Sequence, residues 1–345
     1  MKPNPAQVNP TGSSGCSTFT PPFNAPSLIV GPGALGAYTL PASGAVAADA
    51  GENIVYVAIP GPAPGPAILK IDLDAVSVTA FCDAARFAAF DPAISALTGI
   101  ALLDHDTLFV VDSSTNRILS VTASAMSSYA GISSSLGGYA DGSLGSCLFR
   151  FSSPVQIAVG GDGTVFVPDP GNHRIRQITG GVVTTLAGSG IPGYLDATGT
   201  SARFDTPDCI AIECSGNLVI TEAGNRVRRI QFKVNQSTFG GNQTIAVVGT
   251  LAGDGNPNSV DGTGGASGTA EVFAPCAVNV GKDGAIYWLD RGTGYIRRID
   301  SSSGSDVVTT PFGAPVVPPF TSFGLVGAFA EGIFVDSVNN QLSKF

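Results

Sequence analysis

The sequence predicts an all-β protein, a six-bladed β-propeller whose blades each contain four strands. Two observations predict this fold. A pair of alternating apolar strands recurs six times along the chain, and further short apolar strands flank most of the copies. Glycine and proline, 45 and 24 of the 345 residues, supply the many turns that such a repeat needs.

The repeated unit is clearest in its central copies. Each copy has an alternating apolar strand, an acidic residue or a turn, and a second alternating strand with long polar side chains. The six copies lie at 54–71, 107–121, 164–178, 217–230, 285–299 and 332–345. A short apolar strand such as "QIAVG" (156–160) precedes the copies, and a Thr/Val-rich strand such as "TTLAG" (184–188) follows them. Four strands per unit describe propeller blades, each of which buries its faces against its neighbours.

The two ends of the chain predict how the ring closes. The sixth copy stops at Phe345 on its third strand, and "PSLIVGPGA" (26–34) has the character of a fourth strand. We therefore expect the N-terminal segment to complete the last blade, which leaves no free strand edge at the seam. The predicted organisation is a propeller over 26–345 and a separate Pro/Gly/Ser-rich arm over 1–25.

The segment "LAGSGIPGYLDATGTSARFDTPDCIAIECSGNLVITEAGNRVRRI" (186–230) resembles NHL-repeat proteins. Their repeat combines an A-x-F-x-x-P motif, a G-I-A-V-D-like strand, a G-N-L-Y-V-A-D-like strand and N-R-I-R. The resemblance implies a propeller of NHL-like blades. It does not imply an activity, because the family includes enzymes, protein-binding modules and RNA-binding modules.

Residues that recur in the repeat have structural interpretations. A phenylalanine precedes a proline where four blades begin, and we expect its ring to fill the wedge between neighbouring blades. These residues are Phe87, Phe151, Phe204 and Phe273. Acidic residues close the second strand at a nearly constant offset from basic residues on the third, so we expect opposite charges to pair across the two strands. The predicted blade pairs join Asp112, Asp169, Glu222 and Asp290 to Arg117, Arg174, Arg226 and Arg297.

Composition argues against several classes of partner and site. A net charge of −9 disfavours general nucleic-acid binding, and a basic surface for RNA on the third strands is the weaker alternative. No apolar run is long enough to span a bilayer. Two histidines, His105 and His173, are too few for a multi-histidine zinc site. The six cysteines lack a CxxC pair, which leaves buried thiols and disulfides both open.

Acidic residues in the connectors between blades have two interpretations. Asp141, Asp196 and Asp261 lie among glycines, where aspartate favours turns. A divalent cation such as calcium is the alternative, although it prefers more oxygen ligands than one aspartate in each loop provides. We predict no catalytic, cofactor-binding or metal-binding residue, because no Ser–His–Asp order, phosphate-binding loop or spaced carboxylate pair occurs.

The function that these observations favour is a non-catalytic structural or interaction propeller. We expect it to belong to a large extracellular assembly or a virion, as a decoration, tail or surface appendage, with protein subunits as partners. The arm over 1–25 would anchor it, and loops such as 191–201 and 233–245 would carry recognition. The start of the chain has no apolar signal-peptide segment. The alternatives are a metal-dependent lactonase or hydrolase with its site at the channel mouth, and a secreted ligand-binding propeller.

Overall fold

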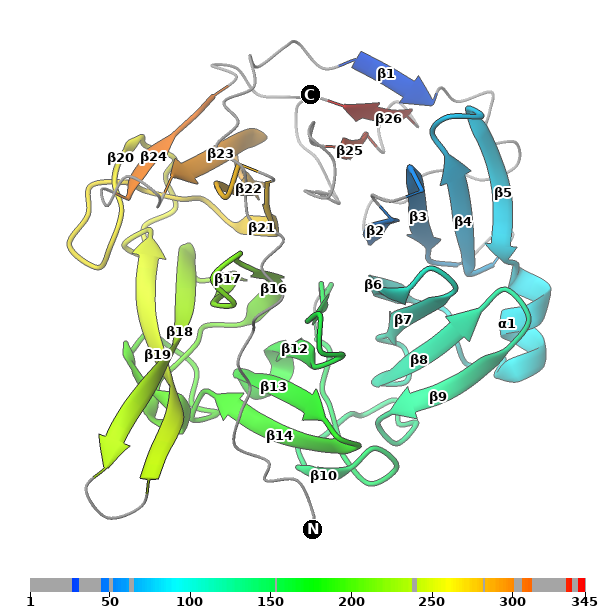
Figure 1. Cartoon of the computed structure of the whole chain (residues 1–345), viewed down its shortest axis with the longest axis horizontal. Coiled ribbons are helices and arrows are strands. Elements are labelled where there is room, and N and C mark those ends of the chain that lie inside the picture. The colour runs from blue at the N-terminus through cyan, green and yellow to red at the C-terminus, as the bar shows by residue number, and fades with distance from the viewer. Residues whose placement is uncertain are drawn as a thin grey trace.

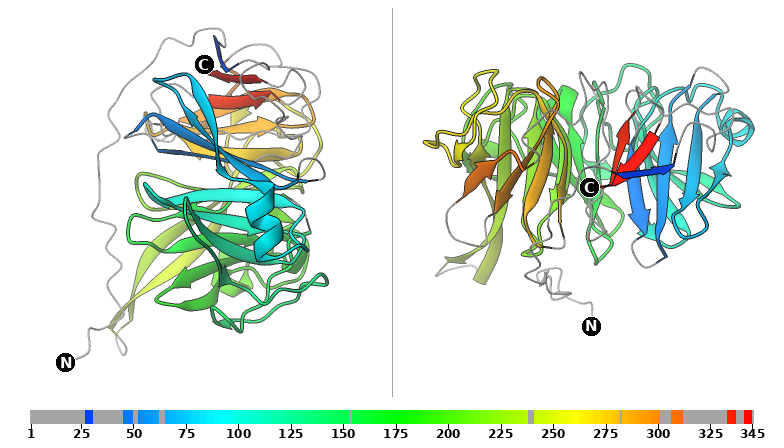
Figure 2. Two further views of the ribbon diagram at one scale, coloured as in Figure 1. Left: turned by 90° about the vertical axis from the view of Figure 1, so that its right-hand side faces the viewer. Right: turned by 90° about the horizontal axis from the view of Figure 1, so that it is seen from above.

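The computed structural model describes residues 27–30, 45–49, 52–61, 65–152, 154–237, 241–281, 283–300, 306–311, 333–336 and 341–344. These residues form antiparallel sheets that follow one another around a ring, as in a β-propeller (Figure 1). Figure 2 shows the same blades from the side, with the strands crossing the thickness of the ring. The all-β propeller that the sequence predicts is thus confirmed.

Blades 1 and 2 each contain four strands in sequential order. Blade 1 consists of β2 (Val46–Asp49), β3 (Ile54–Ile59), β4 (Ala67–Asp72) and β5 (Ser77–Cys82). Blade 2 consists of β6 (Leu97–Asp104), β7 (Thr107–Asp112), β8 (Arg117–Thr122) and β9 (Met126–Ala130). The helix α1 (Ala84–Phe90) lies between the two blades in the chain, and the Asp83 side chain caps its first turn.

Blades 3, 4 and 5 each contain a fifth strand. Blade 3 consists of β10 (Gly142–Ser143), β11 (Ala158–Val159), β12 (Val165–Asp169), β13 (Arg174–Thr179) and β14 (Val182–Ala187). Blade 4 consists of β15 (Ala197–Thr198), β16 (Pro207–Ile212), β17 (Leu218–Glu222), β18 (Arg226–Ser237) and β19 (Gly241–Ala252). Blade 5 consists of β20 (Gly262–Thr263), β21 (Pro275–Val280), β22 (Ile286–Asp290), β23 (Tyr295–Asp300) and β24 (Val307–Thr309).

The fifth strand comes from the connector that joins one blade to the next. β10, β15 and β20 each pair with the outermost strand of the blade that follows them, before the chain turns inward. Each connector therefore covers a sheet edge that would otherwise present unpaired backbone groups. Single-turn 3-10 helices, Pro170–Asn172 and Gly199–Ser201, complete the turns of blade 3 and of the connector before blade 4.

The two ends of the chain meet in a smaller sheet. β1 (Ser27–Val30) pairs with β26 (Gln341–Lys344), which pairs with β25 (Ile333–Asp336). The first of these pairings is the one that the sequence predicts for the seam. Six four-stranded blades are not supported, however, because five blades have four or five described strands and this sheet has three. The segment 312–332 and the arm 1–25 lie outside the described residues.

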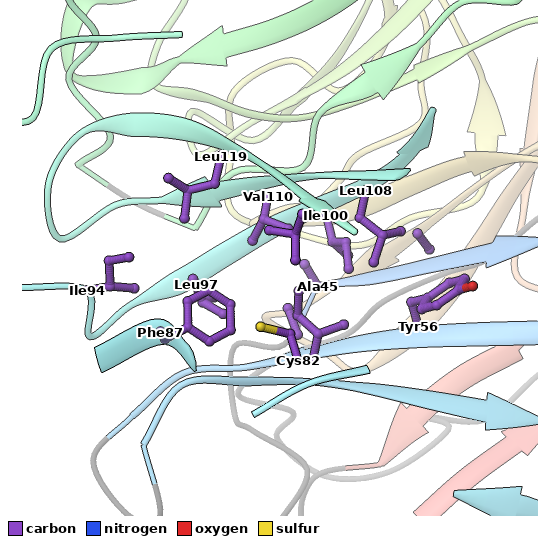
Figure 3. Packing of buried hydrophobic residues seen from close by; sticks show 14 of the residues in the cluster. Ala45, Tyr56, Cys82, Phe87, Ile94, Leu97, Ile100, Leu108, Val110 and Leu119 are labelled. Carbon is purple, nitrogen blue, oxygen red and sulfur yellow. The ribbon is translucent and has the colours of Figure 1, made fainter. Parts of the chain in front are cut away.

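The core lies between neighbouring blades. The second strand of each of the five blades is covered on both faces: β3, β12, β17 and β22 are buried along their whole length, and β7 at every residue except Thr107. Figure 3 shows one interface, where Tyr56 and Cys82 of blade 1 pack with Leu108 and Val110 of blade 2. Phe87 of α1 closes the outer side of this cluster. Burial of such apolar surface is the main source of stability for the ring.

The phenylalanines at the blade starts follow the prediction in part. Phe87, Phe151 and Phe204 are buried, whereas Phe273 is only half-buried. Equivalent backbone bridges, Ala140–Leu148, Leu195–Arg203 and Val260–Glu271, align the last three connectors. This alignment makes Phe149, Phe204 and Val272 the equivalent core residues, and all three are fully buried. Alignment of the repeats by their prolines selects Phe151 instead of Phe149. Phe151 is a second ring that stacks on Phe149, with centroids 5.3 Å apart.

The predicted charge pairs use a different arginine in two blades. Asp112 pairs with Arg117 (3.3 Å) and Asp290 with Arg297 (2.6 Å). Asp169 pairs instead with Arg176 (2.8 Å), and Glu222 with Arg228 (2.7 Å). Although Arg174 and Arg226 lie opposite the acids in register, they begin their strands and fold over tyrosine rings. The arginine two residues further along lies on the same sheet face and is covered by the connector.

The buried arginines also hold the connectors. Besides its blade acid, each binds an aspartate of the preceding connector: Arg176 binds Asp141, Arg228 binds Asp196 and Arg297 binds Asp261. Each also donates to two backbone carbonyls, such as those of Leu148 (3.0 Å) and Ala140 (2.7 Å) for Arg176. The turn interpretation of these aspartates is therefore incomplete, since they are ion-pair partners. We call each acid–arginine–aspartate set a connector clamp.

A second contact joins consecutive blades. Asn116, His173 and Asn225 adopt positive φ angles of 57, 53 and 57° in the turn before the third strand. Each side chain accepts a hydrogen bond from a backbone N–H where the next blade begins: Phe151 to Asn116 Oδ1, Thr206 to His173 Nδ1, and Ala274 to Asn225 Oδ1. His173 is therefore a link between blades 3 and 4, with Nδ1 as its acceptor.

Candidate functional site

The blades present their loops at two ends of the ring. Antiparallel strands reverse direction, so the turns after the first and third strands lie at one end, which we call the turn end. The turns after the second strand and the connectors between blades lie at the other end, which we call the connector end. Side chains at each end define a separate candidate site.

At the turn end, three potential metal ligands meet between blades 1 and 2. Asp49 ends β2, Glu52 lies in the β2–β3 turn and His105 lies in the β6–β7 turn. Their ligand atoms all lie within 4.8 Å of one another. Among the described residues, this is the one such group of three or more His, Cys, Asp or Glu side chains. We call it the turn-end cluster.

The turn-end cluster is strongly negative. His105 Nδ1 is hydrogen-bonded to Asp49 Oδ2, and this contact, followed by the charges of Asp49 and Glu52, raises the pKa of His105. Asp49 is 6% exposed, while His105 and Glu52 face water. The Tyr56 hydroxyl donates to the His105 carbonyl (3.4 Å), which ties the turn of blade 2 to blade 1. An imidazole and two carboxylates are donors that divalent metal ions accept.

The sequence did not predict this cluster, because His105 and His173 were judged only as two histidines, too few for a multi-histidine zinc site. The positions of these residues in the repeat could have predicted the cluster. Asp49, Glu52 and His105 occupy equivalent turns of two consecutive repeats, and equivalent turns of neighbouring blades lie side by side in a propeller.

At the connector end, Asp208 is a buried carboxyl group between blades 4 and 5. It is the second residue of β16, is 7% exposed and accepts a hydrogen bond from Thr221 Oγ1 (2.6 Å). Burial raises the pKa of Asp208 to about 7, against the opposing effects of the Thr221 bond and the Arg291 charge. Gln156, just before β11, crosses to blade 5 by donating from Nε2 to the Val278 carbonyl (2.9 Å). The inner strands near these residues therefore carry polar groups.

The cysteines adopt both of the states that the sequence left open. Cys214 is disulfide-bonded, whereas Cys82, Cys147, Cys209 and Cys276 are free thiols. Burial raises the pKa of Cys82 to about 11 and that of Cys209 to about 12. Free cysteines of this kind are inert structural residues. Cys16 lies outside the described residues.

Exposed apolar side chains gather on the connectors. Among the residues that the structure describes, seven of the 13 exposed large hydrophobic residues lie on three successive connectors. They are Ile132, Leu136 and Tyr139 before blade 3, Ile191, Tyr194 and Leu195 before blade 4, and Val260 before blade 5. The predicted recognition loop 191–201 belongs to the second of these connectors. In the other predicted loop, residues 233–237 pair with residues 241–245 at the end of β18 and the start of β19.

Two tyrosines on these connectors are held in place by arginines. The Arg174 guanidinium lies 3.9 Å from the ring centroid of Tyr139, and that of Arg226 lies 4.2 Å from Tyr194. The Tyr139 hydroxyl contacts Thr185 Oγ1 (3.1 Å), and the Tyr194 hydroxyl accepts from Thr250 Oγ1 (3.2 Å). The arginines predicted to pair with blade acids therefore fix aromatic side chains at the surface.

In the part of the chain that the structure describes, no helix has the length and apolar character needed to cross a membrane. No protein-family model and no curated protein matches the sequence.

Solved structures with the same fold are numerous. A Bacteroides thetaiotaomicron VPI-5482 protein of unknown function superposes with a TM-score of 0.56 at 14% identity, over 92% of this chain and 74% of the other. An auxiliary nutrient binding protein from Bacteroides ovatus ATCC 8483 gives 0.56 at 15% identity, over 85% of this chain and 66% of that protein. A gluconolactonase from Xanthomonas campestris gives 0.54 at 14%, over 93% and 94%. At such identities the likeness shows the β-propeller fold alone.

Proposed function

We propose that this chain is a non-catalytic interaction propeller that binds a protein partner through its connectors. The observation that carries the proposal is the repetition of exposed apolar side chains on successive connectors, where Leu136 is 85% exposed. Contiguous apolar surface on a soluble protein marks an interaction site more often than isolated exposed residues do. The connectors share this feature because they are equivalent positions of consecutive repeats.

The tyrosines give this surface the character of a protein-binding site. Tyr139 and Tyr194 offer large rings with a polar tip, a type of side chain enriched at interfaces. Arg174 and Arg226 already restrict these rings, so binding would cost little side-chain entropy. Tyrosine and arginine are also among the residues that are enriched at interface hot spots.

Site-specific photo-crosslinking in the cells that produce the protein tests this proposal. A photoreactive residue placed at Leu136 or at Ile191 should capture the same protein partner. The control is Val182, which is exposed to a similar degree as Ile191 but lies at the turn end. Leu136→Ser should lower the yield from position 191. Crosslinking that is no stronger than at position 182, or that Leu136→Ser leaves unchanged, would contradict the proposal.

The proposal extends to a larger extracellular assembly or a virion, to which the arm over 1–25 would anchor the propeller. Its support is compositional, since only 12% of the residues are charged. Deleting 1–25 should leave a folded propeller that no longer incorporates. We also propose that the seam sheet is a sixth blade and that the blades are NHL-like, on the strength of the β1–β26 pairing and the repeat motifs.

A metal-dependent lactonase or hydrolase is the second candidate function. The turn-end cluster favours it, because its ligand atoms converge at one end of the ring in a fold shared with a gluconolactonase. The cluster draws on two blades, whereas a site of this kind is expected to use three or more. Lactone hydrolysis that requires an added divalent ion and is lost in His105→Gln would support this function.

A further inference from the structure

We propose that Asp49, Glu52 and His105 form a binding site for a divalent transition-metal ion of the zinc class, which clamps blade 1 to blade 2. The inference concerns a different end of the ring from the connectors and does not depend on a protein partner. It also does not depend on catalysis, because the ion would act as a structural link between two blades.

The first argument is the convergence of the ligands. The three donor atoms lie within 4.8 Å of one another and come from two turns that face each other across a blade interface. Ligand atoms about 2.0–2.2 Å from a tetrahedral zinc ion lie roughly 3.3–3.6 Å apart, so small side-chain rotations suffice. An ion between Asp49 Oδ2 and His105 Nδ1 would take the place of the proton that these atoms share.

The second argument is a comparison with equivalent turns of other blades. The turn acids of blades 4 and 5 pair with arginines from their third strands, Glu213 with Arg229 (2.7 Å) and Asp283 with Arg298 (3.3 Å). Arginine neutralises such acids permanently and cannot bind a metal. Where blades 1 and 2 meet, an imidazole from the neighbouring blade contacts Asp49, and an imidazole is a metal ligand.

The third argument is the surrounding charge and geometry. Asp104 and Asp106 flank His105, so four carboxylates surround a single imidazole and attract cations to this point. Asp104 Oδ1 accepts from the Asp106 N–H (3.0 Å), and Tyr56 holds the His105 carbonyl, which fixes the turn that carries the imidazole. The exposed side of His105 and Glu52 leaves room for water to complete the coordination.

The donor set indicates the class of metal. Calcium takes six to eight oxygen ligands and magnesium an octahedron of oxygens, whereas this set contains one nitrogen and two carboxylates. Imidazole with carboxylates suits zinc and its first-row neighbours. Three protein ligands and one water are sufficient for tetrahedral zinc.

The test is calorimetric titration of the full-length, untagged protein with zinc after treatment with a chelator. The wild type should bind one zinc ion per chain, and saturation should raise its melting temperature by about 3–6 °C at a 100-fold excess over Kd. Glu52→Gln and His105→Gln should each weaken zinc binding at least tenfold. Both residues are exposed, so these variants should fold as the wild type does; circular dichroism without metal checks this.

The matched control is His173→Asn, which removes the other histidine at the connector end and should leave zinc binding unchanged. Absence of stoichiometric binding, or binding that survives both turn-end variants, would overturn the proposal. So would a loss of binding in His173→Asn alone. Tighter binding of calcium than of zinc at the same residues would overturn the assignment of the metal class.

Discussion

Arg176 Nη1 lies 2.8 Å from Asp169 Oδ2, although neither side chain is exposed to water. Burying two charges is costly, and the structure offsets the cost with further partners. The same guanidinium binds Asp141 (2.6 Å) and two backbone carbonyls of the connector. Arg228 and Arg297 repeat the arrangement in blades 4 and 5. Three connectors are thus held by buried charge rather than by apolar packing alone.

Removing one arginine of a connector clamp should destabilise the protein strongly. Arg228→Met leaves Glu222 buried without its cation and frees Asp196, so we expect the free energy of unfolding to fall by about 3–5 kcal/mol. Urea unfolding measures the loss. Arg226→Met is the matched control, since the half-buried Arg226 covers Tyr194 at the start of the same strand, and it should cost about 1 kcal/mol or less. Equal losses in the two variants would contradict a special role for the buried arginine.

Replacing His173 tests the link between blades 3 and 4. His173→Ala leaves the Thr206 N–H without its acceptor and strains the positive φ, so we expect a loss of about 1–2 kcal/mol in thermal or urea unfolding. His173→Asn should match the wild type or exceed it, because asparagine fills the equivalent positions 116 and 225 and tolerates this backbone conformation. If asparagine and alanine have the same effect, the hydrogen bond contributes nothing.

Stability should depend on pH through Asp208. Its pKa rises from 3.8 to about 7 in the folded protein, so the folded carboxyl keeps a proton that the unfolded chain has lost. Its contribution is complete below about pH 4 and is lost as the pH rises through 7. Asp208→Asn cannot ionise. Relative to wild type, this variant should therefore gain about 2–3 kcal/mol between pH 5 and pH 8 in urea unfolding, and a constant difference would exclude the raised pKa.

The buried thiols should be unreactive in the folded protein. Thiolate is the reactive form, and burial raises the pKa of Cys82, Cys147 and Cys209. At pH 8 a disulfide reagent such as DTNB should leave all three unmodified until urea unfolds the chain, as peptide mapping by mass spectrometry would show. Rapid native modification of Cys209 would indicate that the inner wall of blade 4 opens.

The propeller could be predicted from the sequence because the same pattern of strands recurs in each blade. Alternating strands place Asp112 beside Arg117 and Asp290 beside Arg297, and both ion pairs are present. Periodicity does not distinguish Arg174 from Arg176, however, since both side chains lie on the same sheet face. The choice between them depends on which one the connector covers, and this is a tertiary property. The proline spacing placed Phe273 in the core for a similar reason, although Val272 is the buried residue.

The candidate sites were harder to predict because their residues are far apart in the chain. The turn-end cluster joins Asp49 and Glu52 to His105, which belongs to the next repeat. Nothing in the segment "TPDCIAI" indicates that Asp208 is buried, because its burial depends on packing between blades. A single sequence shows neither the packing of one repeat on the next nor the burial that changes the pKa of a carboxyl group.

The pairing of β1 with β26 joins residues that are about 300 positions apart, from Ser27–Val30 to Gln341–Lys344. The entropy of closing such a loop grows only logarithmically with its length, so equilibrium stability loses little. The order of assembly is affected more. During synthesis β1 leaves the ribosome long before β26 has been made. The edge of β1 therefore stays without this partner while the intervening blades form. We therefore expect circularisation to be the last folding event, and the nascent arc to be the species most exposed to wrong pairings between chains.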